Sequence, residues 1–205
     1  RFWKRDDFMS KTKKIIITII SILLCALIVI AVVCKSNQNV QKIIKDDFGS
    51  SISIVLDNPS DYGLSDIDAS SDIEILNETN INNLSNDKGN VISIPVVIND
   101  NIELIYSISL TACSYNVSVG KDYAPLLNEM RKNGYNEVYI IQDEYTFYAI
   151  SDNHIYKQSG QEITQIDEKD LDFTIQDDMK KSDLSSVNDD YTQAAIESLK
   201  TANNE

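Results

Sequence analysis

The chain has 205 residues and a formal net charge of −14 at pH 7, with the charge distributed unevenly. Residues 1–14 carry six Lys or Arg, whereas residues 36–205 carry eleven basic against thirty acidic side chains, a net charge of −19. A surface this acidic repels phosphate backbones, so the composition argues against nucleic acid as a partner. Only Cys113 of the three cysteines lies beyond residue 34, which excludes a disulfide within that part.

The apolar stretch IIITIISILLCALIVIAVV occupies residues 15–33. As a helix, nineteen residues extend about 28 Å, which just spans the hydrocarbon core of a bilayer. Three lysines within residues 11–14 precede the stretch and, by the positive-inside rule, place the N-terminus in the cytoplasm. We therefore expect residues 15–34 to be a single-pass transmembrane signal anchor, with the lipid bilayer as partner and the following domain outside the cell membrane.

Two alternatives to a retained anchor stay open. A cleaved signal peptide has a shorter apolar region and small residues before the cut, whereas this stretch ends in Ala31-Val32-Val33. Lipidation needs a small residue before the cysteine, whereas Cys25 follows a leucine and Cys34 a valine. Both patterns fit less well than a retained anchor.

The next segments predict a stalk followed by strands. Residues 36–50 are polar, with one possible helical turn, and indicate a spacer. Residues 51–56 (SISIVL) and 72–76 (DIEIL) alternate apolar and polar side chains, which is typical of half-buried strands.

A β-hairpin is predicted where residues 91–98 and 102–110 flank the turn composition Asn-Asp-Asn. Pro95 cannot donate a hydrogen bond to a ladder, so the first strand is expected at an edge or with a bulge there. Residues 115–119 predict a further short strand.

One convincing helix is predicted between Asp122, a good N-cap, and Gly134, a good residue just past a helix end. Its apolar side chains fall at i, i+3, i+4 and i+7, a stripe that should pack on a sheet. The pattern then predicts a meander of four strands at residues 137–142, 145–151, 154–158 and 162–167.

Together these elements predict an α+β fold, in which one helix covers one face of a mainly antiparallel sheet. The acidic, Ser- and Asn-rich C-terminal residues predict a loosely docked or disordered tail, although residues 188–202 could form one helix capped by Asn188 or Asp189. The expected organisation is a basic cytoplasmic segment at 1–14, an anchor at 15–34, a stalk at 36–50, an extracytoplasmic domain at 51–167 and a tail at 168–205.

The sequence offers little to support catalysis. His154 is the only histidine and is expected to be exposed in a hairpin turn, and no orienting carboxylate or nucleophile can be assigned to it beyond a Cys113–His154 pair. The acidic loop at residues 57–74 fails the EF-hand spacing, so a solvated loop is favoured over a calcium site. We expect no catalytic residues, no metal and no cofactor.

Aromatic side chains concentrate in the meander and suggest one binding surface. If Tyr139, Tyr148 and Tyr156 share an outer face, they form a flat amphipathic patch suited to peptide, protein or glycan contacts. The sequence therefore favours a membrane-anchored, extracytoplasmic, non-catalytic interaction module of a bacterial cell envelope, with an unknown protein partner. The alternatives are a propeptide-like inhibitor or accessory subunit of a secreted enzyme, or a secreted protein released by signal cleavage.

Overall fold

The computed structural model describes residues 39–64, 67, 71–84, 91–111, 114–185 and 189–202, together with residues 19 and 22–24. The chain forms two compact units, one of Arg1–Asn39 with Ala112–Ser114 and one of Val40–Thr111 with Tyr115–Glu205. Most of the anchor predicted at residues 15–34 lies outside the described residues, and the four described within it are helical. Among the described residues, no helix combines the length and apolarity needed to cross a membrane.

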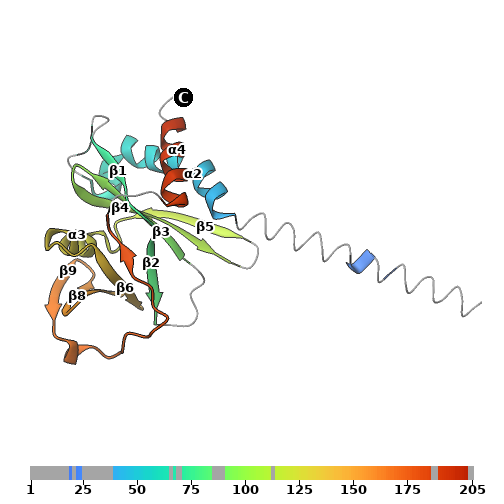
Figure 1. Cartoon of the computed structure of the whole chain (residues 1–205). Helices are drawn as coiled ribbons and strands as arrows, with labels where there is room; N and C mark the ends of the chain where they lie inside the picture. Colours follow the sequence, from blue (N-terminus) through green and yellow to red (C-terminus); the bar gives the residue numbers. More distant parts are fainter. Residues whose placement is uncertain are drawn as a thin grey trace, which may run out of the picture. The chain divides into compact units, whose positions relative to one another are not determined.

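The second unit contains helices at both ends and strands between them (Figure 1). In chain order its elements are α2 Val40–Asp57, η1 Pro59–Tyr62, β1 Ile73–Ile75, β2 Thr79–Asn83, β3 Val91–Ile98, β4 Asn101–Leu110, β5 Tyr115–Gly120, α3 Ala124–Lys132, β6 Glu137–Asp143, β7 Thr146–Ser151, β8 His154–Ser159, β9 Glu162–Ile166, η2 Glu168–Asp170, β10 Ser182–Asp183 and α4 Asp190–Ala202.

The described strands form one sheet in the order β5-β4-β3-β2-β6-β7-β8-β9, with β1 beside β3 and β10 beside β6. β2 runs parallel to β6, and the other described pairs are antiparallel. The first residues of β2 pair with β3 and its last three pair with β6, so this short strand joins two halves of the sheet. The α+β class and the mainly antiparallel sheet are confirmed.

The predicted hairpin and meander are also confirmed. Asn99 and Asp100 connect β3 to β4 with φ angles of 50° and 70°, the left-handed conformations that a tight two-residue hairpin turn requires. The edge position considered for β3 is wrong, because β4 lies on one side of it and β1 and β2 on the other. The alternative of a bulge in the first strand at Pro95 is also wrong, because Pro95 pairs with Ile105 and the irregularity lies in β4, where Glu103 is left unpaired between the partners of Val96 and Val97.

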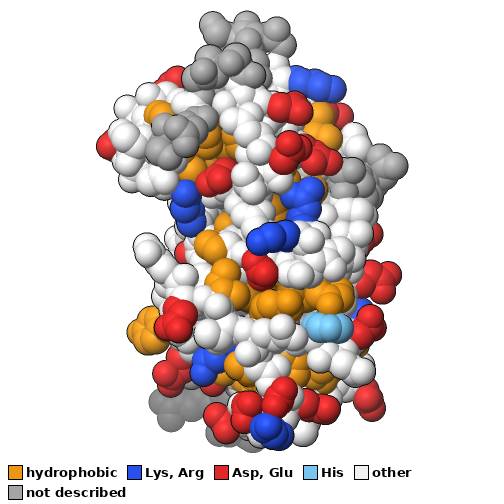
Figure 2. Space-filling view, turned by 90° about the vertical axis from the view of Figure 1, so that its left-hand side faces the viewer, with side chains coloured by type: hydrophobic (Ala, Val, Ile, Leu, Met, Phe, Trp, Pro, Cys, Tyr) orange, Lys and Arg blue, Asp and Glu red, His pale blue; other side chains and the backbone are white. Residues whose placement is uncertain are grey.

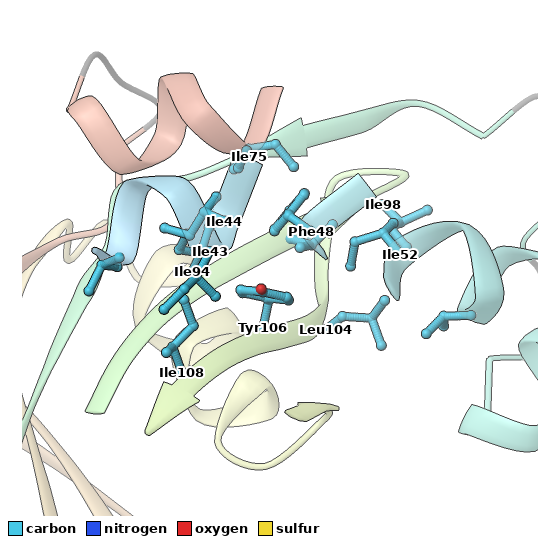
Figure 3. Packing of buried hydrophobic residues seen from close by; sticks show 14 of the residues in the cluster. Ile43, Ile44, Phe48, Ile52, Ile75, Ile94, Ile98, Leu104, Tyr106 and Ile108 are labelled. Carbon is cyan, nitrogen blue, oxygen red and sulfur yellow. The ribbon is translucent and has the colours of Figure 1, made fainter. Parts of the chain in front are cut away.

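The first hydrophobic cluster lies between α2, α4 and the half of the sheet that contains β3 and β4. Figure 3 shows isoleucines and Phe48 of α2 facing side chains of these two strands. The Phe48 ring meets the ring of buried Tyr106 edge-on, with centroids 4.9 Å apart. The Tyr106 hydroxyl donates to Asp47 Oδ2 across 3.1 Å, so the one polar atom of this buried ring is satisfied.

Two predictions fail at α2: the stalk at residues 36–50 and the strand at residues 51–56. The helix covers residues 40–57, and its buried side chains recur at helical spacing in Val40, Ile43, Ile44, Phe48, Ile52 and Val55. The six residues SISIVL alternate apolar and polar side chains as a strand would. They are only the last part of α2, however, and the apolar residues of the whole segment follow helical spacing. Ile54, which the strand pattern would bury, is 57% exposed.

The prediction of one covering helix and a loose tail at 168–205 is also wrong for the described part of the tail. The helix considered there is present as α4, and it packs along α2. Gly49 of α2 permits this contact, because a Cβ atom on it would lie 2.3 Å from the Ser198 carbonyl oxygen. The Gly49 N–H donates to Ser198 Oγ across 2.8 Å.

The predicted helix near residues 122–134 is confirmed as α3, and it packs against β4, β7 and β8. Its stripe of Tyr123, Leu126, Leu127 and Met130 is buried in a second cluster that draws side chains from both halves of the sheet. A third cluster lies on β6, β7 and β8, where Leu171, Phe173 and Met179 from the segment after η2 pack against it.

Candidate functional site

The three tyrosines predicted to form one outer patch lie on two faces of the sheet. Tyr148 packs in the third cluster, whereas Tyr156 packs in the second cluster with α3. The register explains the difference, because Tyr156 pairs with Ala149, the neighbour of Tyr148, and adjacent residues of a strand point to opposite faces. With Tyr148 only 7% and Tyr156 only 9% exposed, the shared patch is wrong.

Tyr139 and Tyr148 do share a face, but other side chains lie over their rings. The Lys181 ammonium is 5.4 Å from the Tyr139 ring centroid, and the Lys157 ammonium is 5.8 Å from that of Tyr148. Phe173 meets Tyr148 edge-on at 5.1 Å. Both tyrosines therefore pack against other side chains of the domain, with Tyr148 buried and Tyr139 half-buried.

His154 is half-buried, contrary to the exposed position expected for it. Its ring lies 4.8 Å from that of Tyr135, and its buried Nδ1 atom has no hydrogen-bond partner among the described residues. Cys113 lies outside the described residues, so the structure does not test the Cys113–His154 pair, which the sequence disfavours.

The acidic loop is distributed over several elements. Asp57 ends α2, Asp61 lies in η1 and Glu74 lies in β1, while Asp66 and Asp68 lie outside the described residues. In the described ranges, no three His, Cys, Asp or Glu side chains gather in a group that could hold a metal ion.

The structure instead shows an open polar groove of about 380 Å³ between α3 and the β3–β4 turn. We call it the α3 groove. Its volume falls within the range of ligand-binding clefts. It is lined by Asp100, Asn101, Pro125, Asn128, Glu129, Arg131 and Lys132.

Two cations in the lining of the α3 groove have no ion-pair partner among the described residues. Arg131 is half-buried and Lys132 is exposed, and neither is within 4.0 Å of a carboxylate oxygen in the described part of the chain. Both belong to the last turn of α3, where positive charge complements the helix dipole. An unpaired guanidinium is also a ready bidentate donor to a carboxylate.

The two walls of the groove are joined by Asn128. Its Oδ1 accepts from the Ile102 N–H at 2.8 Å, and its Nδ2 donates to the Ile102 carbonyl at 2.9 Å. This paired contact fixes α3 against the start of β4, beside the β3–β4 turn. The groove is therefore built by elements that are held together, which favours a preformed site.

The other end of α3 is held by buried groups. Gln158 Oε1 accepts from the Leu126 N–H at 3.1 Å, and Gln158 Nε2 donates to the Asp122 carbonyl at 2.8 Å. The Tyr123 hydroxyl lies 2.8 Å from Thr79 Oγ1. Burial raises the pKa of Tyr123 to about 12, although its hydrogen bonds favour the charged form. The phenol is therefore neutral and structural at ordinary pH.

Figure 2 views the side of the molecule that carries α3. Basic side chains gather near mid-height on this face, beside a band of hydrophobic side chains, with acidic side chains above and below. A ligand that approaches this side therefore meets side chains of both charges close together.

Sequence reasoning missed this site, although part of its pattern is present. Pro125, Asn128, Glu129 and Lys132 repeat at i, i+3, i+4 and i+7, a polar stripe next to the buried one on α3. What the sequence could not show is the β3–β4 turn on the opposite side of the groove.

The fold and the groove define the protein only as an α+β domain with a preformed polar cleft. No protein-family model matches the chain, and the searches of curated proteins and solved structures also found no match.

Proposed function

We propose that residues 15–33 hold this chain in a bacterial cell membrane and that the following domain, outside the membrane, binds a protein partner without catalysing a reaction. The length of the apolar stretch and the lysines before it support the anchor. The single observation that supports binding is the pair of unpaired cations in the α3 groove.

The groove is favoured over the tyrosine patch for a physical reason. A binding site needs exposed groups that are not already satisfied, whereas the rings of Tyr139 and Tyr148 already contact Lys or Phe side chains of the chain itself. Arg131 and Lys132 face a cleft and have no described acidic partner, so a ligand would gain contacts there.

Site-specific photo-crosslinking in intact membranes tests this proposal. A photoreactive residue replaces Lys132 in the full chain, and the same residue replaces Lys169 as a control, because Lys169 is 75% exposed and lies in η2. We expect a discrete protein adduct from position 132 that position 169 does not give. Identical adducts from both positions, or none from position 132, would contradict a binding role for the groove. If the protein in the adduct is a secreted enzyme, the result would favour the inhibitor alternative.

A further inference from the structure

The balance of charges in the α3 groove restricts the ligand further. Arg131 and Lys132 stand with Asp100 and Glu129, so the lining has two positive and two negative side chains. Phosphate or another multiply charged anion would meet two carboxylates beside the two cations, in a part of the chain, residues 36–205, whose net charge is −19. The lining instead matches a ligand that brings both signs of charge.

Within the groove, the carboxylates and the cations are kept apart. Glu129 Oε1 accepts a hydrogen bond from Asn133 Nδ2 at 3.0 Å, which directs this carboxylate to a neutral neighbour. Asp100 is exposed in the β3–β4 turn, on the wall opposite α3. None of the four charges is neutralised by another at ion-pair distance, so each is open to a ligand.

From this arrangement, and resting on the proposed function, we infer that the α3 groove binds a basic segment of the partner protein through one carboxylate side chain of that segment. The Arg131 guanidinium and the Lys132 ammonium bind the carboxylate. Asp100, Glu129 and the acidic surface around the groove attract the flanking Lys or Arg side chains and speed association. A groove of about 380 Å³ has room for only a few side chains, so the recognised segment is short.

Fluorescence anisotropy with three dye-labelled peptides tests this inference on the full chain in nonionic detergent micelles. The first peptide is N-acetyl-Lys-Ala-Glu-Ala-Lys-amide, the second has Gln in place of Glu, and the third has Gln in place of both Lys. We expect the second peptide to bind about fivefold more weakly than the first, since one partly exposed charged contact is lost. The third should bind more weakly than the first at low salt, and added salt should narrow this difference, because it screens the attraction between the two Lys side chains and the acidic surface around the groove.

A double-mutant cycle shows whether the contact is with Arg131. In Arg131→Ala, the peptides with Glu and with Gln should bind within about twofold of each other, because the carboxylate has lost its principal partner. Lys45→Ala is the matched control, since it removes one positive charge from an exposed ion pair between α2 and α4. This variant should keep the fivefold difference.

The inference is overturned if the peptides with Glu and Gln bind alike to the unaltered chain, if Arg131→Ala keeps their difference, or if no peptide binds at millimolar concentration. These outcomes are separable from failure of the proposed function. A position-132 adduct together with equal binding of the two peptides would leave the groove as a binding site and reject only this ligand chemistry.

Discussion

At the scale of single residues, Gly49 controls the contact between α2 and α4. A methyl group there would overlap the Ser198 carbonyl, which belongs to the backbone and cannot rotate away. We expect Gly49→Ala to lower the free energy of unfolding by about 2 kcal/mol, because overpacking outweighs the gain of about 1 kcal/mol in helix propensity. Urea unfolding of the full chain in detergent micelles measures the change.

A neighbouring residue provides the control for this substitution. Ser50 is exposed on the same helix, and its hydroxyl donates only to the Asp47 carbonyl one turn earlier. Ser50→Ala should therefore change the free energy of unfolding by less than about 0.5 kcal/mol. Equal effects at the two positions would show that the helices do not depend on the close approach at Gly49.

The half-buried Glu78 makes stability depend on pH. Burial raises the pKa of its carboxyl, the neighbouring Asp189 carboxylate raises it further, and Lys180 acts in the opposite direction. Because the pKa of Glu78 is higher in the folded than in the unfolded chain, binding of a proton to this carboxyl favours the folded state. This contribution to stability is fully present below the unfolded pKa, about 4.3, and is lost as pH rises through the folded pKa.

Glu78→Gln tests this dependence. The neutral amide avoids the cost of burying a charge, so the variant should be more stable than the unaltered chain at pH 7, by less than about 1 kcal/mol because the site is partly solvated. The gain should disappear below about pH 4, where Glu78 is protonated in both states. Thermal unfolding at pH 7 and below pH 4 measures the gain in stability. A gain of the same size at both pH values would refute the raised pKa of Glu78.

At the scale of elements, Asp189 ties α4 to the sheet. Its Oδ1 accepts from the N–H groups of Tyr191 and Thr192 at 2.8 and 2.7 Å, and its Oδ2 accepts from the Glu78 N–H at 3.1 Å. Asp189→Ala should cost about 2 kcal/mol, because it removes the helix cap and the link to the start of β2. Asp189→Asn keeps the oxygen that caps α4 but puts an NH2 donor where Oδ2 accepts from the Glu78 N–H. It should therefore keep the cap, lose the link to the start of β2 and cost less than Asp189→Ala. Hydrogen exchange of α4 amides distinguishes the two, and similar exchange in both variants would argue against the cap.

The elements that the sequence predicted well are those whose conformation is determined by residues within the element itself. The β3–β4 turn has side chains that tolerate positive φ, and α3 has a complete apolar stripe and a glycine after its end. α2 was mistaken for a stalk and a strand because its burial depends on α4, which lies about 140 residues later. The tyrosine patch failed for a similar reason, because the segment that covers Tyr148 comes from beyond the meander.

At the scale of the whole molecule, the proposed anchor predicts how the chain behaves in membranes. The full chain should stay in the membrane pellet after alkaline extraction, whereas a chain that lacks residues 15–33 should be released, since this predominantly apolar stretch of nineteen residues supplies the insertion energy. Protease added outside intact cells should degrade the domain. Release of the full chain, or protection of its domain from external protease, would contradict the proposed location.

The central claim is that Arg131 and Lys132 make the α3 groove a binding site, and one measurement addresses it directly. For this test the photoreactive residue replaces Asn101, an exposed groove residue at the start of β4, so that Arg131 and Lys132 both remain. The adduct yield in intact membranes is compared among the otherwise unaltered chain, Arg131→Ala and Lys45→Ala. We predict that Arg131→Ala lowers the yield at least fivefold and that Lys45→Ala leaves it unchanged. An undiminished adduct in Arg131→Ala would contradict the claim.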